Sequence, residues 1–145
     1  MERTIEAVRR ANDAFYQAFE KLDIQEMEPL WSKENYVKCV HPGWEAAIGW
    51  KAVRDSWVLI FNHTYKIKFS VEVLDITVNG EWGWTLCSEQ ISTQDQGKWV
   101  HGKVIGTNLF ECRDGQWRLI HHHGSPQLMI EEKKSDEAED GRSLS

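Results

Sequence analysis

The chain has 145 residues, a length that usually forms one domain with a single core, and its formal charge of -6, from 23 acidic against 17 basic residues, argues against a nucleic-acid-binding surface. Its three cysteines lack metal-ligand spacing, which argues against a disulfide framework or a zinc site and favours a reducing, cytoplasmic setting. No run of residues approaches the ~20 apolar residues of a membrane span, so we expect a soluble protein without a membrane partner.

The first half of the chain is predicted to be mainly helical. Residues 2–21 place apolar side chains at helical spacing, and residues 24–31 predict a short second helix that packs back on the first. Residues 36–41 predict a short strand, which a Pro-Gly pair ends. Residues 50–62 then predict a third helix with its apolar side chains on one face.

The second half is predicted to consist of strands joined by tight turns. Residues 65–78 alternate apolar and polar side chains, and the alternation changes phase near Val73, which predicts a β-bulge that bends the strand. Asn-Gly, Gln-Gly and Asp-Gly pairs follow at intervals. They predict hairpins that connect further strands over residues 81–94, 98–112 and 117–126.

The two later turns predict which side chains share a face of the sheet. With the Gln-Gly pair at one tip, Thr85 lies opposite Asn108, and with the Asp-Gly pair at the other tip, Asn108 lies opposite His121. This face is apolar near the turn and becomes polar away from it, as expected for the floor of a ligand pocket. The polar end of the predicted pocket carries Thr85, Cys87, Glu89, Asn108, His121 and His123.

The opposite face of the same strands is predicted to be apolar. A monomer would leave this face exposed to water, and large exposed apolar patches usually mark interfaces. We therefore expect a homodimer formed sheet against sheet. The residues expected at its interface are Trp82, Trp84, Leu86, Ile105, Ile120 and His122.

The composition changes near the end of the chain. Residues 128–145 are highly charged and contain no aromatic side chain, so they bury too little surface to offset the entropy of ordering. We expect one domain over residues 1–127, followed by an acidic, disordered tail.

Three stretches carry a resemblance to a known family: FYQAFEKLDIQEMEPLW in the first helices, VHPGW at the corner after the first strand, and RDGQWRLIHHHGSP at the end. With the order of helices and strands, they resemble the nuclear transport factor 2-like superfamily, and its SnoaL-like branch in particular, over residues 4–127. The resemblance implies an α+β, cystatin-like fold, a cone-shaped barrel in which a curved mixed or antiparallel sheet wraps around the N-terminal helices. The superfamily contains enzymes, binding proteins and assembly domains, so the fold alone does not give a function.

Ketosteroid isomerase is the superfamily member whose chemistry maps most directly on this chain. The resemblance places its helix-one tyrosine at Tyr16, its general-base aspartate at His41 and its second oxyanion donor at Asn108. An imidazole suits proton abstraction near neutral pH, and Tyr16 and Asn108 would then hold the oxygen of an enolate. Two of the three positions differ in residue type, so the resemblance implies candidate catalytic residues and not this particular isomerase.

Each candidate also has a structural explanation, which the sequence leaves open. His41 could cap the turn that follows it, and Tyr16 could be a core residue whose hydroxyl bonds to the backbone. A buried Glu89 would need a partner, and His121 or His123 could provide one without any catalytic role.

The histidine run and the tryptophans complete the candidate site. We expect no metal site, because His121 and His123 share a strand face while His122 points the other way. Trp44, in the loop after the first strand, is predicted to overhang the mouth of the pocket, and Trp57 is predicted to line it. A flat apolar ligand would suit such a pocket.

Three functions follow from these observations. The first is a SnoaL-like protein that binds a small apolar or carbonyl-containing molecule. The second is a general acid–base enzyme, such as an isomerase, cyclase or dehydratase, with His41 as base; the chain has no glycine-rich phosphate loop, and we expect no cofactor. The third is an oligomerisation module like the association domain of calcium/calmodulin-dependent protein kinase.

Overall fold

The computed structural model describes residues 2–128, so the expected disordered tail lies, apart from its first residue, outside the described residues. The predicted order of helices followed by long strands is confirmed, with one short strand, β2, that the sequence did not predict. In chain order the elements are α1 (Glu2–Lys21), α2 (Ile24–Met27), the 3-10 helix η1 (Glu28–Leu30), β1 (Lys38–Val40), β2 (Ala47–Ile48), α3 (Trp50–Asn62), β3 (Lys66–Asn79), β4 (Trp82–Asp95), β5 (Lys98–Arg113) and β6 (Gln116–Pro126).

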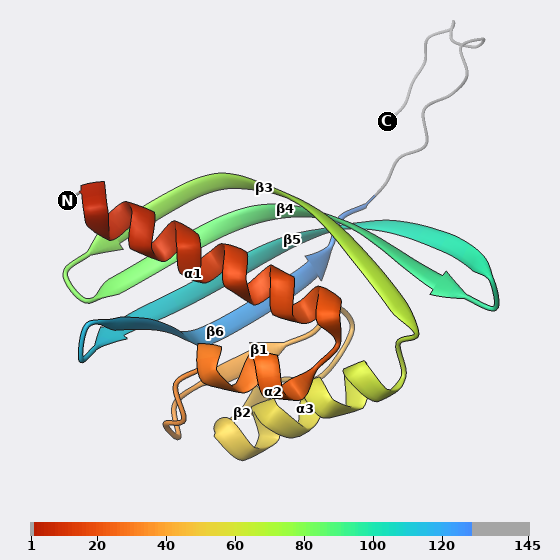
Figure 1. The fold of residues 1–145 in the computed structure, drawn as a ribbon, viewed down its shortest axis with the longest axis horizontal. Coiled ribbons are helices and arrows are strands. Elements are labelled where there is room, and N and C mark those ends of the chain that lie inside the picture. Colours follow the sequence, from red (N-terminus) through yellow and green to blue (C-terminus); the bar gives the residue numbers. More distant parts are fainter. Residues whose placement is uncertain (1, 129–145) are drawn as a thin grey trace, which may run out of the picture.

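Helix α1 crosses one face of the sheet, with α2 and α3 near its C-terminal end (Figure 1). It is amphipathic, and its apolar side chains, Phe15 and Phe19 among them, are buried against the sheet and α3. The helix ends at Lys21, and the next residue, Leu22, has a φ of 54° in the left-handed region. Asp23 then caps α2 by accepting a hydrogen bond from a backbone amide of that helix at 2.9 Å. This corner directs the chain toward the strand β1.

The strands form one six-stranded sheet in the order β2-β1-β6-β5-β4-β3. Strand β1 pairs with β6 in parallel, and the other neighbouring pairs are antiparallel. The sheet curves around α1 (Figure 1), which confirms the predicted α+β fold with a mixed, curved sheet around the N-terminal helices. The sheet is nevertheless open, with β2 and β3 as its edges. The expected barrel is therefore not closed.

Two of the predicted registers are confirmed. The register of β3 with β4 shifts between Val73 and Asp75, which is the predicted β-bulge. In the β4–β5 hairpin Thr85 lies opposite Asn108, as the Gln-Gly turn predicts. The inner face of β4 therefore carries Thr85, Cys87 and Glu89, and all three side chains are buried.

The predicted register between β5 and β6 is wrong beyond the first residues after the turn. Phe110 lies opposite Leu119, but the next pair joins Leu109 to His121, so Ile120 is an extra residue in β6. This bulge reverses the facing of every later residue of the strand. Asn108 consequently lies opposite His122, and His122 is buried.

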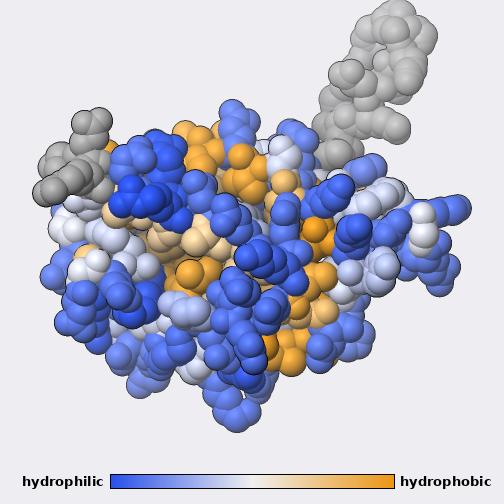
Figure 2. Space-filling model, viewed as in Figure 1, coloured by the Kyte–Doolittle hydropathy of each residue, from blue (hydrophilic) through white to orange (hydrophobic). Residues whose placement is uncertain are grey.

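Aromatic side chains fill the space between the helices and the sheet. Trp57 of α3 contacts Phe15 and Phe19 of α1 edge to face, with ring centroids 5.6 and 4.8 Å apart. On the face that Figure 2 shows, hydrophobic side chains form small patches among hydrophilic ones. No helix within residues 2–128 is long and apolar enough to span a membrane.

Candidate functional site

An open groove of about 530 Å³ lies between the C-terminal end of α3 and the corner that follows β1. Helix α1 and the start of β3 each contribute one side chain to its wall, which is mainly apolar. This composition is typical of small-molecule sites, in which few polar groups sit among apolar ones. The groove is lined by Phe19, His41, Pro42, Trp44, Leu59, Ile60, His63, Thr64 and Ile67.

His41 is the buried polar residue of this wall. It follows β1 directly, and its Nε2 lies 2.9 Å from Ser56 Oγ on α3 and 3.5 Å from Cys39 Sγ. Its Nδ1 is buried and has no hydrogen-bond partner among the described residues. Burial lowers the pKa of His41 to about 4, so the ring is neutral at neutral pH. This residue of the groove wall thus combines a neutral imidazole with one buried, unpartnered nitrogen.

Two tryptophan rings hold the imidazole of His41 in place. The ring of Trp57 meets it edge to face at 4.6 Å, and the ring of Trp44 does so at 5.1 Å. Trp44 is 41% exposed and borders the groove. Trp57 is fully buried and is not part of the groove lining, so it supports His41 from behind.

A second set of polar side chains lies between α1 and the inner face of the sheet. Asn108 Nδ2 donates to Asn12 Oδ1 at 2.9 Å and to the Tyr16 hydroxyl at 3.2 Å. The Tyr16 hydroxyl donates to Glu89, and Asn108 Oδ1 lies 2.6 Å from His122 Nδ1. These side chains are buried and hydrogen-bonded to one another. We name the set the interior polar cluster; it comprises Asn12, Tyr16, Thr85, Cys87, Glu89, Asn108 and His122.

Burial favours the neutral forms of the titratable groups in the interior polar cluster. It raises the pKa of Glu89 to about 7, although the hydrogen bond from Tyr16 acts in the opposite direction. Burial also raises the pKa of the Tyr16 hydroxyl, and the Glu89 carboxylate adds to this shift. It lowers the pKa of His122, and the neighbouring imidazole of His41 acts in the same direction with a smaller effect. Below neutral pH the cluster is thus held mainly by hydrogen bonds between uncharged groups, and near neutrality Glu89 is partly ionised.

The structure divides the candidate catalytic residues between two places. Tyr16 and Asn108 lie in the interior polar cluster, and neither lines the groove. His41 lines the groove, with its ring centroid 6.4 Å from that of His122. The hydrogen bonds that Tyr16 and Asn108 donate therefore go to protein groups. Of the three candidate catalytic residues, His41 alone lines the groove.

The predicted positions of His121 and His123 are wrong. Because of the extra residue Ile120, both face away from α1, with ring centroids 6.2 Å apart, and His121 lies opposite Lys38 of β1. The pairing of either histidine with Glu89 is excluded by this facing. Over residues 2–128, no group of three or more side chains is placed to hold a metal ion.

Sequence reasoning missed Asn12, Ser56 and His122. Asn12 precedes Tyr16 by one helical turn, and Ser56 follows the buried Val53 by three residues, so both are polar residues on the apolar side of a helix. Such positions demand hydrogen-bond partners, which is a usable signal. His122 carried no clear signal, because Leu119 and Ile120 are both apolar and three histidines follow, so the pattern fits either facing of His122.

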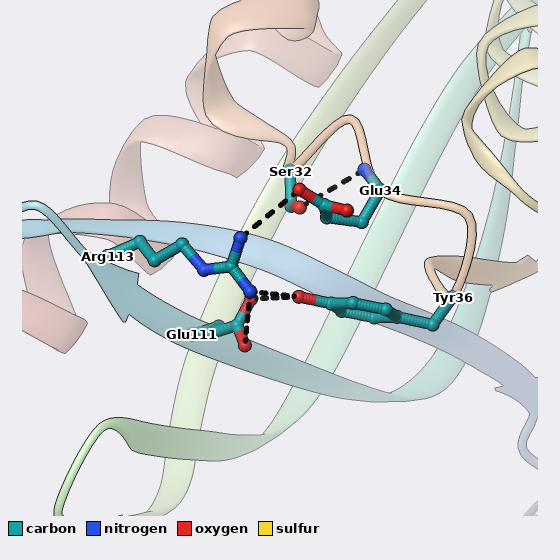
Figure 3. A network of polar contacts seen from close by, with 5 residues as sticks. All are labelled: Ser32, Glu34, Tyr36, Glu111 and Arg113. Carbon is teal, nitrogen blue, oxygen red and sulfur yellow. Dashed lines mark hydrogen bonds and ion pairs between the residues drawn. The ribbon is translucent and has the colours of Figure 1, made fainter.

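A third polar cluster joins the loop after η1 to the end of β5 (Figure 3). Arg113 contacts the Glu34 carboxylate at 3.2 Å and the Tyr36 hydroxyl at 3.2 Å, and Tyr36 donates to Glu111 at 2.6 Å. Within this cluster each charged group faces an opposite charge or a hydroxyl. We name it the loop anchor and assign it a structural role, since its members already bond to one another.

The comparisons with known proteins agree with the fold. The model of the SnoaL-like domain matches residues 8–130. A candidate dehydratase of the NTF2-like family from Streptomyces avermitilis is 32% identical, with a TM-score of 0.82 over 89% of this chain and 100% of that chain. A candidate calcium/calmodulin-dependent protein kinase type II association domain from Thiobacillus denitrificans is 25% identical, with a TM-score of 0.75 over 81% of this chain and 93% of that chain.

A curated relative is longer than this chain. The F-box protein SKIP8 of Arabidopsis thaliana is 28% identical over 130 residues, which are 90% of this chain and 54% of the relative. The chain thus spans about half the length of the curated relative that it matches. The family model covers most of the chain, and the predicted resemblance is confirmed: the chain belongs to the family of SnoaL-like domains.

Proposed function

We propose that the protein binds a small, mainly apolar molecule in the groove beside His41. The observation that carries this proposal is the pairing of an apolar wall with a buried nitrogen, His41 Nδ1, that has no partner among the described residues. Leaving a buried acceptor unsatisfied costs about 1–3 kcal/mol, so a ligand that satisfies it gains affinity. The volume of about 530 Å³ lies within the range of small-molecule sites.

A charge placed in the groove wall tests this proposal. Leu59 lines the groove and is 47% exposed, so Leu59→Glu can be made without disturbing the core. The expected result is that small aromatic and alicyclic probes shift the indole NMR signal of Trp44 in the wild type. They should bind the variant at least about tenfold more weakly, because the carboxylate must be desolvated.

Leu74 provides the matched control. It is the extra residue of the β3 bulge, is 48% exposed and does not line the groove. Leu74→Glu makes the same chemical change at the same exposure and should leave probe affinity unchanged. Equal losses in the two variants would contradict binding in the groove, as would unchanged affinity in both.

A second candidate function is general acid–base catalysis with His41 as the base. The specific support is that His41 is neutral, is held by Ser56 and two tryptophan rings, and keeps Nδ1 free. A candidate dehydratase among the solved structures agrees with this class of reaction. Because Tyr16 and Asn108 do not line the groove, this version of the proposal assigns them no contact with the substrate.

Hydrogen exchange in heavy water tests the catalytic candidate. If His41 removes protons next to a carbonyl, the protein accelerates deuterium incorporation beside the carbonyl of tetralone, and His41→Gln abolishes the acceleration. The rate should rise with pH through the lowered pKa of His41, about 4, and then stay level toward neutrality. His101→Gln, at an exposed histidine of β5, is the control. If the wild-type protein does not accelerate the exchange, the catalytic proposal is contradicted and the proposed binding function is unaffected.

We also propose that two copies of the chain pair through the outer sheet face, defined as Trp82, Trp84, Leu86, Ile105 and Leu109. The support is that Trp82 and Trp84 are 52% and 53% exposed and that Trp84 lies opposite Leu109 on the same face. Ile120 and His122, which the sequence placed on this interface, are buried on the inner side instead.

A further inference from the structure

Three buried polar atoms have no hydrogen-bond partner among the described residues: His41 Nδ1 and the indole nitrogens of Trp31 and Trp57. The indole nitrogens can only donate, and neither tryptophan lines the groove beside His41. Of these three residues, His41 is therefore the one that lines the groove and also has a buried polar atom without a partner. Which hydrogen-bonding group a ligand needs depends on whether His41 Nδ1 carries a hydrogen.

The surroundings of Nε2 favour one answer. Val53 O, 2.7 Å from Ser56 Oγ on the same helix, takes the one hydrogen of that hydroxyl, so toward His41 Ser56 Oγ accepts. In this arrangement Nε2, 2.9 Å from Ser56 Oγ, carries the hydrogen of the neutral ring. The Cys39 thiol, 3.5 Å from Nε2, is a weak hydrogen-bond donor. If the thiol donated to a bare Nε2, the lone pairs of Nε2 and of Ser56 Oγ would face each other. Nδ1 is consequently a bare acceptor.

The other two polar side chains of the groove wall are partly occupied. The Thr64 hydroxyl donates to Ile60 O at 2.7 Å, and His63 Nδ1 donates to Leu59 O at 2.9 Å, which leaves His63 Nε2, at an exposed residue, for a ligand. The remaining wall is apolar and favours a ligand without charge. A matching ligand is therefore neutral, mainly apolar, and has a hydrogen-bond donor.

We propose that the groove takes a neutral apolar alcohol or phenol whose hydroxyl donates a hydrogen bond to His41 Nδ1; this inference rests on the proposed binding function. A ketone of the same shape would place a second acceptor against Nδ1 and is selected against. Because Nδ1 is buried in this structure, the proposal requires a side chain to move, and Trp44 is the more exposed of the two rings that contact His41.

Matched alcohols and ketones test the proposal. The probes are cyclohexanol and cyclohexanone, tetralol and tetralone, and fluorenol and fluorenone, which share a skeleton within each pair and differ in size between pairs. Their affinities are measured by calorimetry and by the indole NMR signals. The expected result is that the alcohol of the best-fitting pair binds at least about fivefold more tightly than its ketone.

Ser56→Ala is the diagnostic variant. Without the Ser56 oxygen, the ring hydrogen is no longer held on Nε2, so either nitrogen can carry it and the preference for the alcohol should narrow toward equality. Arg113→Ala, in the loop anchor, should keep the wild-type preference. A preference that survives Ser56→Ala unchanged would show that the hydrogen position does not select the ligand, which overturns the proposal.

The outcomes separate this proposal from the function on which it rests. If alcohols and ketones bind equally, or the ketones bind more tightly, and Leu59→Glu weakens both, the groove is a binding site but the donor preference is wrong. If no probe of any size binds, the binding function itself fails and this proposal fails with it.

Discussion

Glu89 is a carboxyl group buried between α1 and the sheet, where it accepts a hydrogen bond from Tyr16. Burial raises its pKa from an ordinary value of 4.5 to about 7. Between these two pH values the folded protein holds a proton that the unfolded chain has released. The stabilising effect of this proton is complete below the unfolded pKa and is lost as the pH rises through the folded pKa.

Glu89→Gln tests this linkage. The amide keeps an acceptor for the Tyr16 hydroxyl and cannot ionise, so the variant should gain stability relative to the wild type as the pH rises. Between about pH 5 and about pH 8 the expected relative gain is roughly 2–3 kcal/mol in the free energy of unfolding. Urea unfolding at the two pH values measures it, and Glu72→Gln, at an exposed site on β3, corrects for the change in net charge. A gain independent of pH would contradict the raised pKa.

At the scale of the elements, the bulge in β6 decides which histidine enters the core. His122 is buried beside Asn108, whereas His123 is exposed on the other face. His122→Leu should leave Asn108 Oδ1 without its partner and destabilise the fold by about 1–3 kcal/mol. His123→Leu, the adjacent residue with the same chemical change, should alter the unfolding free energy by less than about 0.5 kcal/mol. Thermal and urea unfolding measure both losses in the free energy of unfolding. If β6 had no bulge, His123→Leu would cause the larger loss.

The strands also show which features of the fold could be predicted from the sequence. The turn residues fixed the tips of the hairpins, and the phase change near Val73 revealed the first bulge, because there the apolar residues stop alternating. The second bulge left no such trace. Leu119 and Ile120 are both apolar and three histidines follow, so the pattern reads equally well in either phase.

The sequence did not predict the position of the groove, and the reason is different. The sequence predicted a pocket on the inner face of the long strands, where Thr85, Glu89 and Asn108 do lie. Whether that interior stays open depends on what α1 places in it, and Asn12 and Tyr16 fill it and bond to the strands. The groove lies instead at the corner after β1, and Trp44 borders it.

At the scale of the whole molecule, the outer sheet face is the feature that a monomer leaves uncovered. Trp84→Lys, near the middle of this face, should convert a dimer to a monomer in sedimentation, because the charge would be buried in the interface. Val100, on β5 near its turn with β4, is 54% exposed compared with 53% for Trp84, so Val100→Lys is the control and should remain dimeric. A wild-type protein that sediments as a monomer at tens of micromolar would contradict the proposed dimer.

The measurement that tests the central proposal most directly is a crystal structure of the protein grown with fluorenol. We predict that the molecule occupies the groove, against Trp44 and Leu59, with its hydroxyl oxygen about 2.8 Å from His41 Nδ1. Fluorenol bound elsewhere on the molecule, with the groove beside His41 unoccupied at a saturating concentration, would contradict the account.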